Sequence, residues 1–174
     1  MTTWSVQNLN KKIEGLDLIA FDLDYTLWPF FVDCSDPPFK KAGKHVVDAC
    51  GGKVKPYPDS TNILQRLSSL GYKIAIASRT SAVKEAKELI NLFGWKQYIN
   101  YQEIYPGCKV THFTQFKKES KIPFDRMIFF DDEERNIVDI NRLGSVAILV
   151  KRGVNNTVVA EGLDYFVRVQ NQKQ

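Results

Sequence analysis

Short apolar runs that alternate with helix-like segments are the feature that most constrains the fold of this chain. Four runs are apolar almost throughout rather than at every second residue: LDLIAF (16–21), KIAIA (73–77), RMIFF (126–130) and SVAILV (145–150). Strands of this kind are buried on both faces, which is typical of a parallel sheet covered by helices. We therefore predict a doubly wound α/β fold, a parallel sheet with helices on both faces.

Apolar residues at helical spacing predict the helices between these strands. One helix is expected to begin at Asp59 or Ser60 and to end at Gly71, and a second spans 83–93 before Gly94. The segment YINYQEIY (98–105) holds a further strand. The remaining helices are expected over 110–120, 134–144 and about 157–169.

The segment 29–58 falls outside this alternation. It contains five prolines and the turn CGGK, and it is too long for an ordinary connection between a strand and a helix. We expect a small inserted lobe there, irregular or hairpin-like, beside the end of the first strand. With 174 residues, the chain is expected to form one domain, residues 1–174, that carries this cap-like insertion.

Charge and hydropathy exclude several classes of protein. The net charge of +4 comes from 24 basic and 20 acidic residues spread along the chain, which argues against a nucleic-acid surface but favours anionic substrates. No run is long enough to span a membrane, and the N-terminus lacks the apolar core of a signal peptide. We expect a cytoplasmic protein that binds neither nucleic acid nor membrane. The sequence does not indicate an oligomeric state.

Polar side chains follow three of the predicted strands directly. Ligands of open α/β sheets bind at the carboxyl ends of the strands, so these side chains are expected to meet in one crevice. A lysine that opens the helix after the turn YPGC can reach the same place. The set is Asp22 and Asp24, then Ser78, Arg79 and Thr80, then Lys109, then Asp131 and Asp132.

Converging carboxylates require a cation between them. Two carboxylates in close contact repel by roughly 4 kcal/mol at intermediate dielectric. Oxygen ligands without histidine or thiolate favour Mg²⁺ over zinc. Ser78, Arg79 and Lys109 suit the non-bridging oxygens of a phosphate. The combination predicts phosphoryl transfer.

The spacing of Asp22 and Asp24 fits two different roles in such a reaction. A turn at the strand end lets both side chains face the crevice. Asp22 can then attack phosphorus and form an acyl phosphate, which divides one difficult hydrolysis into two easier steps. Asp24 can protonate the leaving oxygen and later deprotonate water.

The motifs DLDYT (22–26), SRT (78–80), Lys109 and DDEERN (131–136) resemble the four motifs of the haloacid dehalogenase-like (HAD) hydrolase superfamily. More narrowly, FDLDYTLWPFFVD, EIYPGCKVTHF and IFFDDEERNI are similar to the eukaryotic magnesium-dependent phosphatases, a branch with a minimal cap. The resemblance covers most of residues 18–150. It implies that Asp22 is nucleophile and metal ligand, and that Asp24 is the general acid/base that also offers its backbone carbonyl to the metal.

The resemblance also implies the remaining contacts and the substrates. Phosphate contacts are expected from Ser78, Arg79 and Lys109 and from the backbone amides of Leu23 and Asp24. Of the adjacent Asp131 and Asp132, one is expected to bind the metal directly, and we favour Asp132. Substrates expected for this branch are protein phosphotyrosine and sugar phosphates, including phosphorylated sugar-amine adducts.

Other interpretations of the same residues remain open at this stage. Asp22 and Asp24 alone fit an Asx-turn, Ser78 fits a helix cap, and Lys109 fits a solvated lysine. The ring of Trp28 and those of Phe30 and Phe31 form either an apolar lip for the leaving group or part of the core.

Two other functions use a similar scaffold. A phospho-receiver or phosphate-binding regulatory module would keep a phosphorylated aspartate, but Asp24 would discharge it, and receivers place their paired acids first in the chain. A phosphomutase shares the nucleophile but needs a larger cap than 29–58 provides.

Overall fold

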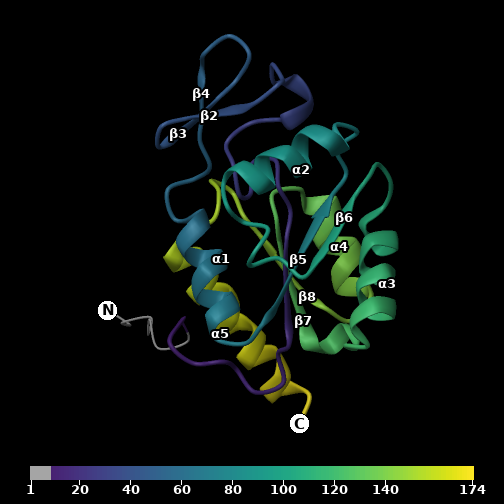
Figure 1. The fold of residues 1–174 in the computed structure, drawn as a ribbon. Coiled ribbons are helices and arrows are strands. Elements are labelled where there is room, and N and C mark those ends of the chain that lie inside the picture. Colours follow the sequence, from purple (N-terminus) through teal and green to yellow (C-terminus); the bar gives the residue numbers. More distant parts are fainter. Residues whose placement is uncertain (1–8) are drawn as a thin grey trace.

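The computed structural model describes residues 9–174, and a five-stranded parallel sheet lies at its centre (Figure 1). The strand order is β6-β5-β1-β7-β8, which places the first strand in the middle. In the register, Phe21 at the end of β1 lies beside Ile76 on one neighbour and Phe130 on the other. The strands are β1 (Leu18–Phe21), β5 (Lys73–Ser78), β6 (Tyr101–Ile104), β7 (Met127–Asp131) and β8 (Val146–Leu149).

Helices cover both faces of this sheet, which confirms the doubly wound α/β prediction. One face packs against α1 (Ser60–Ser69), α2 (Val83–Leu92) and α5 (Asn156–Gln172). The other packs against α3 (Lys109–Ser120) and α4 (Glu134–Arg142). In Figure 1, α1 and α5 lie to the left of the sheet and α3 and α4 to the right.

The uniformly apolar strands explain this three-layer arrangement. In β1, Ile19 and Phe21 point into the core on the α1 and α5 side, whereas Leu18 and Ala20 point into the core on the α3 and α4 side. All four side chains are fully buried. Because successive residues of a strand face opposite sides, burial of both faces requires apolar residues at every position.

The inserted segment forms a small antiparallel sheet rather than a simple hairpin. The strands β2 (Lys40–Ala42), β3 (His45–Val47) and β4 (Lys53–Val54) follow the short 3₁₀ helix η2 (Val32–Cys34). We call residues 29–58 the lobe; it lies beyond α2, at the end of the molecule opposite the C-terminus (Figure 1). Buried Phe39 and Val46 join the lobe to the same apolar cluster as Trp28.

Element boundaries differ from the sequence predictions by a few residues. The last helix is longer than expected, since no glycine or proline follows Val169 and the polar tail continues the helical turns. It begins at Asn156, one residue before the predicted start, and the side-chain oxygen of Asn155 accepts a hydrogen bond of 2.8 Å from the amide of Val158. A second 3₁₀ helix, η3 (Phe124–Arg126), precedes β7. Among the described residues, no helix is long and apolar enough to cross a membrane.

Candidate active site

A tight turn at the end of β1 brings both aspartates of the DLDYT motif to one pocket. The carbonyl of Leu23 accepts hydrogen bonds from the amides of Thr26, Leu27 and Trp28, which folds the chain back on itself. Tyr25 adopts a positive φ of 56°, a conformation that side chains other than glycine, asparagine and aspartate rarely take. The predicted turn is therefore present, and Asp22 and Asp24 both line the pocket.

Asp22 is held from two sides. The residue is 7% exposed, and its Oδ1 accepts a hydrogen bond of 2.9 Å from the ammonium of Lys109. Its Oδ2 accepts a longer one, 3.3 Å, from the hydroxyl of Thr26. Burial raises the pKa of Asp22 to about 7, because the attraction of Lys109 only partly offsets the loss of water and the nearby Asp132 raises it further.

Asp24 does not belong to the cluster of carboxylates that Asp22, Asp131 and Asp132 form. Its Oδ1 accepts hydrogen bonds from the indole Nε1 of Trp28 at 2.7 Å and from the amide of Val32 at 3.0 Å. Burial raises the pKa of Asp24, and these two hydrogen bonds act in the opposite direction. A carboxyl group that is kept apart from the acidic cluster and still lines the pocket can exchange a proton there.

The second strand contributes Ser78 and the two residues after it. Ser78 ends β5 and is buried, and its hydroxyl oxygen accepts a hydrogen bond of 3.3 Å from the amide of Thr80. Arg79 lines the pocket and makes no ion pair with any residue from 9 to 174. Ser78 and Arg79 thus offer a hydroxyl group and a guanidinium group to an anion in the pocket.

Lys109 lies between two carboxylates rather than in solvent. It opens α3, is 1% exposed, and its ammonium donates hydrogen bonds to Asp22 at 2.9 Å, to Asp131 at 2.8 Å and to the carbonyl of Ala77 at 2.5 Å. Burial disfavours its charge, but the two carboxylates outweigh that effect and raise the pKa of Lys109. Because all three N–H groups are occupied, its contact with phosphate stays a prediction that requires one of them to be released.

Asp131 and Asp132 play different structural parts at the end of β7. Asp131 is fully buried and accepts hydrogen bonds from Lys109, from the amide of Glu133 and from the side-chain amide of Asn136. Burial raises the pKa of Asp131 to about 6, with Asp22 adding to the effect. Asp132 is half-buried and lines the pocket, whereas the fully buried Asp131 is not part of the pocket wall.

The carboxylates fit a magnesium ion. Oxygen atoms of Asp22, Asp131 and Asp132 lie within 4.8 Å of one another. Asn136 also lines the pocket, and its Oδ1 is the one buried side-chain oxygen or nitrogen atom without a hydrogen-bond partner among residues 9–174. A hydrated cation supplies both the positive charge and the O–H donors that this set lacks.

The pocket that these residues line has a volume of about 220 Å³. Its wall contains most of the predicted site residues, namely Asp22, Asp24, Ser78, Arg79, Lys109 and Asp132. Leu23 is buried, and its predicted role rests on its backbone amide alone. The volume suits a phosphate group together with a metal ion, and the polar wall suits charge more than an apolar ligand.

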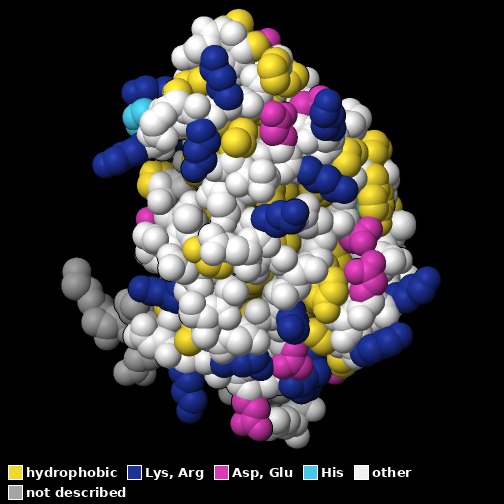
Figure 2. All heavy atoms as spheres, viewed as in Figure 1, with side chains coloured by type: hydrophobic (Ala, Val, Ile, Leu, Met, Phe, Trp, Pro, Cys, Tyr) yellow, Lys and Arg dark blue, Asp and Glu magenta, His cyan; other side chains and the backbone are white. Residues whose placement is uncertain are grey.

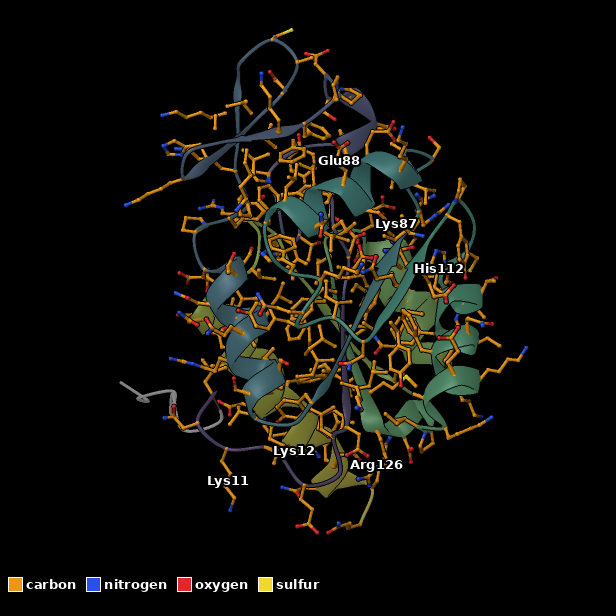
Figure 3. All side chains as sticks on the ribbon, in the orientation of Figure 1. Lys11, Lys12, Lys87, Glu88, His112 and Arg126 are labelled. Carbon is orange, nitrogen blue, oxygen red and sulfur yellow. The ribbon has the colours of Figure 1, made fainter. Side chains whose placement is uncertain are left out.

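Three residues near the site have contacts that the sequence does not predict. Of the two alternatives for Trp28, a lip or the core, the structure shows the core, and the buried indole also donates a hydrogen bond to Asp24. His112 of α3, labelled in Figure 3, is fully buried, and its ring nitrogens lie 2.9 Å from the carbonyl of Ser78 and 3.2 Å from that of Cys108. Asn136 stands in the DDEERN motif, which was the available signal for it.

The arrangement of sheet and site defines the class of this protein. The phosphatase-domain N-terminal part of a Bacteroides fragilis protein, solved with magnesium, has a TM-score of 0.60 at 15% identity, over 88% of this chain and 40% of that one. The Moraxella catarrhalis 3-deoxy-D-manno-octulosonate 8-phosphate phosphatase, solved with magnesium, phosphate and sugar, has a TM-score of 0.52 at 17% identity, over 95% and 91%. These structures show the fold, which is the HAD-like α/β fold.

The chain belongs to the acid phosphatase family, whose family model matches residues 15–169. It is 48% identical to magnesium-dependent phosphatase 1 of Homo sapiens, over 88% of each chain. It is 37% identical to a HAD-like hydrolase superfamily protein of Schizosaccharomyces pombe, over 77% of this chain and 85% of that one. The predicted resemblance to the eukaryotic branch of HAD phosphatases is thereby confirmed.

Proposed function

We propose that this chain is a magnesium-dependent phosphomonoesterase that works through an aspartyl phosphate on Asp22. Its family and its relatives make it a phosphatase enzyme of the HAD superfamily, with magnesium as the cofactor. The observation that carries the mechanism is the separation of the two aspartates. Asp22 belongs to the acidic cluster, whereas the carboxylate of Asp24 lines the same pocket but is bonded to Trp28.

The first half of the reaction forms the covalent intermediate. A carboxylate oxygen of Asp22 attacks phosphorus, the bond from phosphorus to the leaving oxygen breaks, and Asp24 gives that oxygen a proton. Ser78 and Arg79 bind the phosphate oxygens, and Lys109 keeps Asp22 in place and favours its charged form.

The second half releases phosphate. Asp24, now a carboxylate, takes a proton from water, and the resulting hydroxide attacks phosphorus. The bond between Asp22 and phosphorus then breaks, which restores the enzyme and yields inorganic phosphate.

The metal would be held by Asp22, by Asp132 and by the backbone carbonyl of Asp24. Asp131 would support the site from behind through Lys109 and Asn136, in agreement with its complete burial. When bound, magnesium would supply positive charge that reduces the repulsion between the nucleophile and the phosphate.

Proposed substrates are protein phosphotyrosine and sugar phosphates, including phosphorylated sugar-amine adducts. The half-exposed ring of Phe31 lies on the wall of the pocket, where it can contact an aromatic or sugar leaving group. We also propose that residues 1–174 form one domain, that the protein acts in the cytoplasm, and that it binds neither nucleic acid nor membrane.

The experiment is a phosphate-release assay on 4-nitrophenyl phosphate, phosphotyrosine peptides and sugar phosphates, with magnesium or with a chelator. Asp22→Asn keeps the shape of the side chain and removes its negative charge, so we expect activity to fall by at least about 10³-fold. Asp125→Asn, at an exposed position of η3, is the matched control and is expected to retain activity.

Acid quenching during turnover should trap phosphate on the wild-type protein in an acid-stable but base-labile form. Full activity of Asp22→Asn, or activity that survives the chelator, would contradict the mechanism. Phosphorylated protein that persists for hours without turnover would favour a receiver instead.

A further inference from the structure

A second hollow adjoins the catalytic pocket on the other side of Phe31. It has a volume of about 480 Å³, and Phe31 lines both spaces. Its wall combines aromatic rings with two lysines of the lobe, and the residues that matter here are Tyr25, Phe30, Phe31, Lys53 and Lys55. None of them makes or breaks a bond in the reaction proposed above, and Phe31 alone also lines the catalytic pocket.

The apolar part of this wall is unusually open to solvent. Phe31 is 52% exposed and Tyr25 is 38% exposed, and their rings meet edge to face at a centroid distance of 4.7 Å. Residues 9–174 contain four exposed large hydrophobic residues, and Tyr25 and Phe31 are two of these four. Exposed aromatic pairs of this kind are common features of binding surfaces.

The strands of the lobe concentrate positive charge, whereas Asp33 and Asp36 lower the net charge of the whole lobe, residues 29–58, to +2. Residues 40–55 contain five lysines and one aspartate, a net charge equal to the +4 of the whole chain, so the remaining residues balance. All five lysines are exposed. Dark blue side chains and a cyan histidine are visible over the lobe in Figure 2.

Two aspartates share the wall of the hollow with Lys53 and Lys55, so the formal charges of the wall balance, and the excess positive charge lies on the lysines beside it. Asp48 accepts hydrogen bonds from the amides of Cys50 at 3.0 Å and Gly52 at 2.7 Å, so it is engaged in its own loop. Asp36 is the second acidic residue of the wall. Lys53 and Lys55 have no ion pair within the described part of the chain.

We propose that this hollow binds an acidic peptide segment that flanks the phosphorylated side chain, so that phosphoproteins with acidic residues beside the modified site are preferred substrates. The inference rests on the proposed function and narrows its substrate class. A hollow of this size next to the catalytic pocket accommodates several peptide residues beyond the phosphate. Ammonium groups on its wall pair with Glu or Asp, while Tyr25 and Phe31 contact the peptide between them.

The test compares two phosphotyrosine peptides that differ only in their flanks, three Glu in one and three Gln in the other. The proteins are the wild type, Lys53→Gln/Lys55→Gln, and the control Lys11→Gln/Lys118→Gln. The control removes the same charge at exposed positions outside the lobe; Figure 3 labels Lys11 at the opposite end of the molecule.

For the wild type we expect kcat/KM about tenfold higher on the Glu peptide, mainly through KM, with the preference lost at 0.5 M NaCl. The lobe variant should prefer the Glu peptide by less than about threefold, and the control should keep the full preference. Equal activity of the wild type on both peptides would overturn the proposal.

Two further outcomes separate a failure of the proposed function from a failure of the peptide proposal. Lack of activity on 4-nitrophenyl phosphate as well as on both peptides would contradict the proposed function itself. Tight binding of single-stranded RNA that depends on Lys53 and Lys55, without a preference between the peptides, would reassign the surface to nucleic acid and overturn the peptide proposal.

A different observation, the hydrogen bond from Trp28 to Asp24, carries a second inference. The Trp28 ring is fully buried and stacks on Trp95 at 5.9 Å and on Phe30 at 5.4 Å between centroids. Its indole N–H and the amide of Val32 both donate to Oδ1 of Asp24, which leaves Oδ2 without a donor from these groups.

We infer that Trp28 is a positioning residue that fixes the carboxyl group of Asp24 with Oδ2 available for proton exchange. This too rests on the proposed function, in which Asp24 protonates the leaving oxygen. A rigid aromatic stack is a suitable support, because the indole N–H then has one direction in which to donate.

The test uses Trp28→Phe, which keeps an aromatic ring and removes the N–H group. Trp95→Phe is the matched control: it removes an indole N–H from the same stack, one that donates to the hydroxyl of Thr61 at 2.9 Å. Activity is measured on phosphate esters whose leaving groups range from 4-nitrophenol to simple alcohols, because only poor leaving groups need protonation.

For Trp28→Phe we expect kcat/KM to fall by less than about threefold on 4-nitrophenyl phosphate and by at least about tenfold on alkyl phosphates. Trp95→Phe should lower kcat/KM by the same small factor on all of these esters. If Trp28→Phe lowers kcat/KM equally on every ester, Trp28 is only a packing residue, and the inference is overturned. Wild-type activity of Asp24→Asn on alkyl phosphates would instead contradict the proposed function.

Discussion

At the scale of single residues, Lys109 offsets part of the negative charge that the carboxylates bring to the site. Three carboxylates gather at the ends of β1 and β7, and the ammonium of Lys109 contacts two of them from inside the core. The cation predicted for the cluster is thus partly provided by the chain itself. Asp132, which is half-exposed on the pocket wall, stays available to an ion from solution.

Lys109→Met removes this charge while keeping a long apolar side chain. At pH 8 we expect the free energy of unfolding to fall by about 3–5 kcal/mol, because Asp22 and Asp131 are then buried without their partner. At pH 5 the loss should be smaller, since carboxyl groups with pKa values of about 7 and about 6 are protonated there.

Urea denaturation at the two pH values measures the effect. Lys12→Met is the control, because it breaks a partly exposed ion pair with Asp17 and should cost no more than about 1 kcal/mol. If Lys109→Met lowers the free energy of unfolding equally at pH 8 and pH 5, the charge of Lys109 does not account for the loss of stability.

Magnesium affinity should depend on pH through Asp22. In the proposed site the metal binds the carboxylate form of Asp22, and burial raises the pKa of Asp22 to about 7 in the metal-free protein. Between pH 8 and pH 6 its ionised fraction falls from about nine tenths to about one tenth, so the dissociation constant should rise about tenfold. Calorimetric titration with magnesium measures this dissociation constant. In Asp22→Asn, the change of magnesium affinity near pH 7 should disappear. A constant affinity across this range would contradict the prediction.

At the scale of elements, α5 approaches the sheet through a glycine. A Cβ atom on Gly162 would lie 2.6 Å from the ring of Phe130 on β7. In an exposed helix, Gly→Ala stabilises by up to about 1 kcal/mol. Here we expect Gly162→Ala to destabilise by about 1–3 kcal/mol, because the ring must move within the core. Thermal and urea unfolding test this, with the exposed neighbour Glu161→Ala as a control that changes stability by less than about 0.5 kcal/mol. A stabilised Gly162→Ala would show that α5 can move away from the sheet.

The elements of the sheet could be predicted from the sequence because their signal is local. Continuous apolar runs and glycine stops lie within a few residues of the elements they define. The site at the strand ends followed from the topology alone, since parallel strands carry their last residues to the same edge.

What the sequence could not supply are contacts between distant residues. Lys109 and Asp22 are 87 positions apart, and nothing local distinguishes this lysine from a solvated one. The bond from Trp28 to Asp24 depends on the turn and on how the indole packs. The strands of the lobe have two or three residues each, too short for a periodic pattern.

At the scale of the whole molecule, the lobe and the sheet share one core. Phe39 and Val46 of the lobe lie in the same apolar cluster as Trp28, Trp95 and the inner face of α1. The proposed single domain therefore has a physical basis, because the lobe cannot lose its packing without exposing the core beneath it.

We expect unfolding in urea to be one cooperative transition, with a free energy in the range of about 5–15 kcal/mol. Fluorescence of Trp28 and Trp95 reports the junction with the lobe, and far-UV circular dichroism reports the helices around the sheet. Trp4→Phe removes the remaining indole signal. The two midpoints should coincide, and magnesium at a hundred times its dissociation constant should raise the free energy of unfolding by about 2.7 kcal/mol on both probes. Loss of fluorescence at lower urea than loss of helix would show that the lobe unfolds separately, and residues 29–58 would then be a second cooperative unit over the active site.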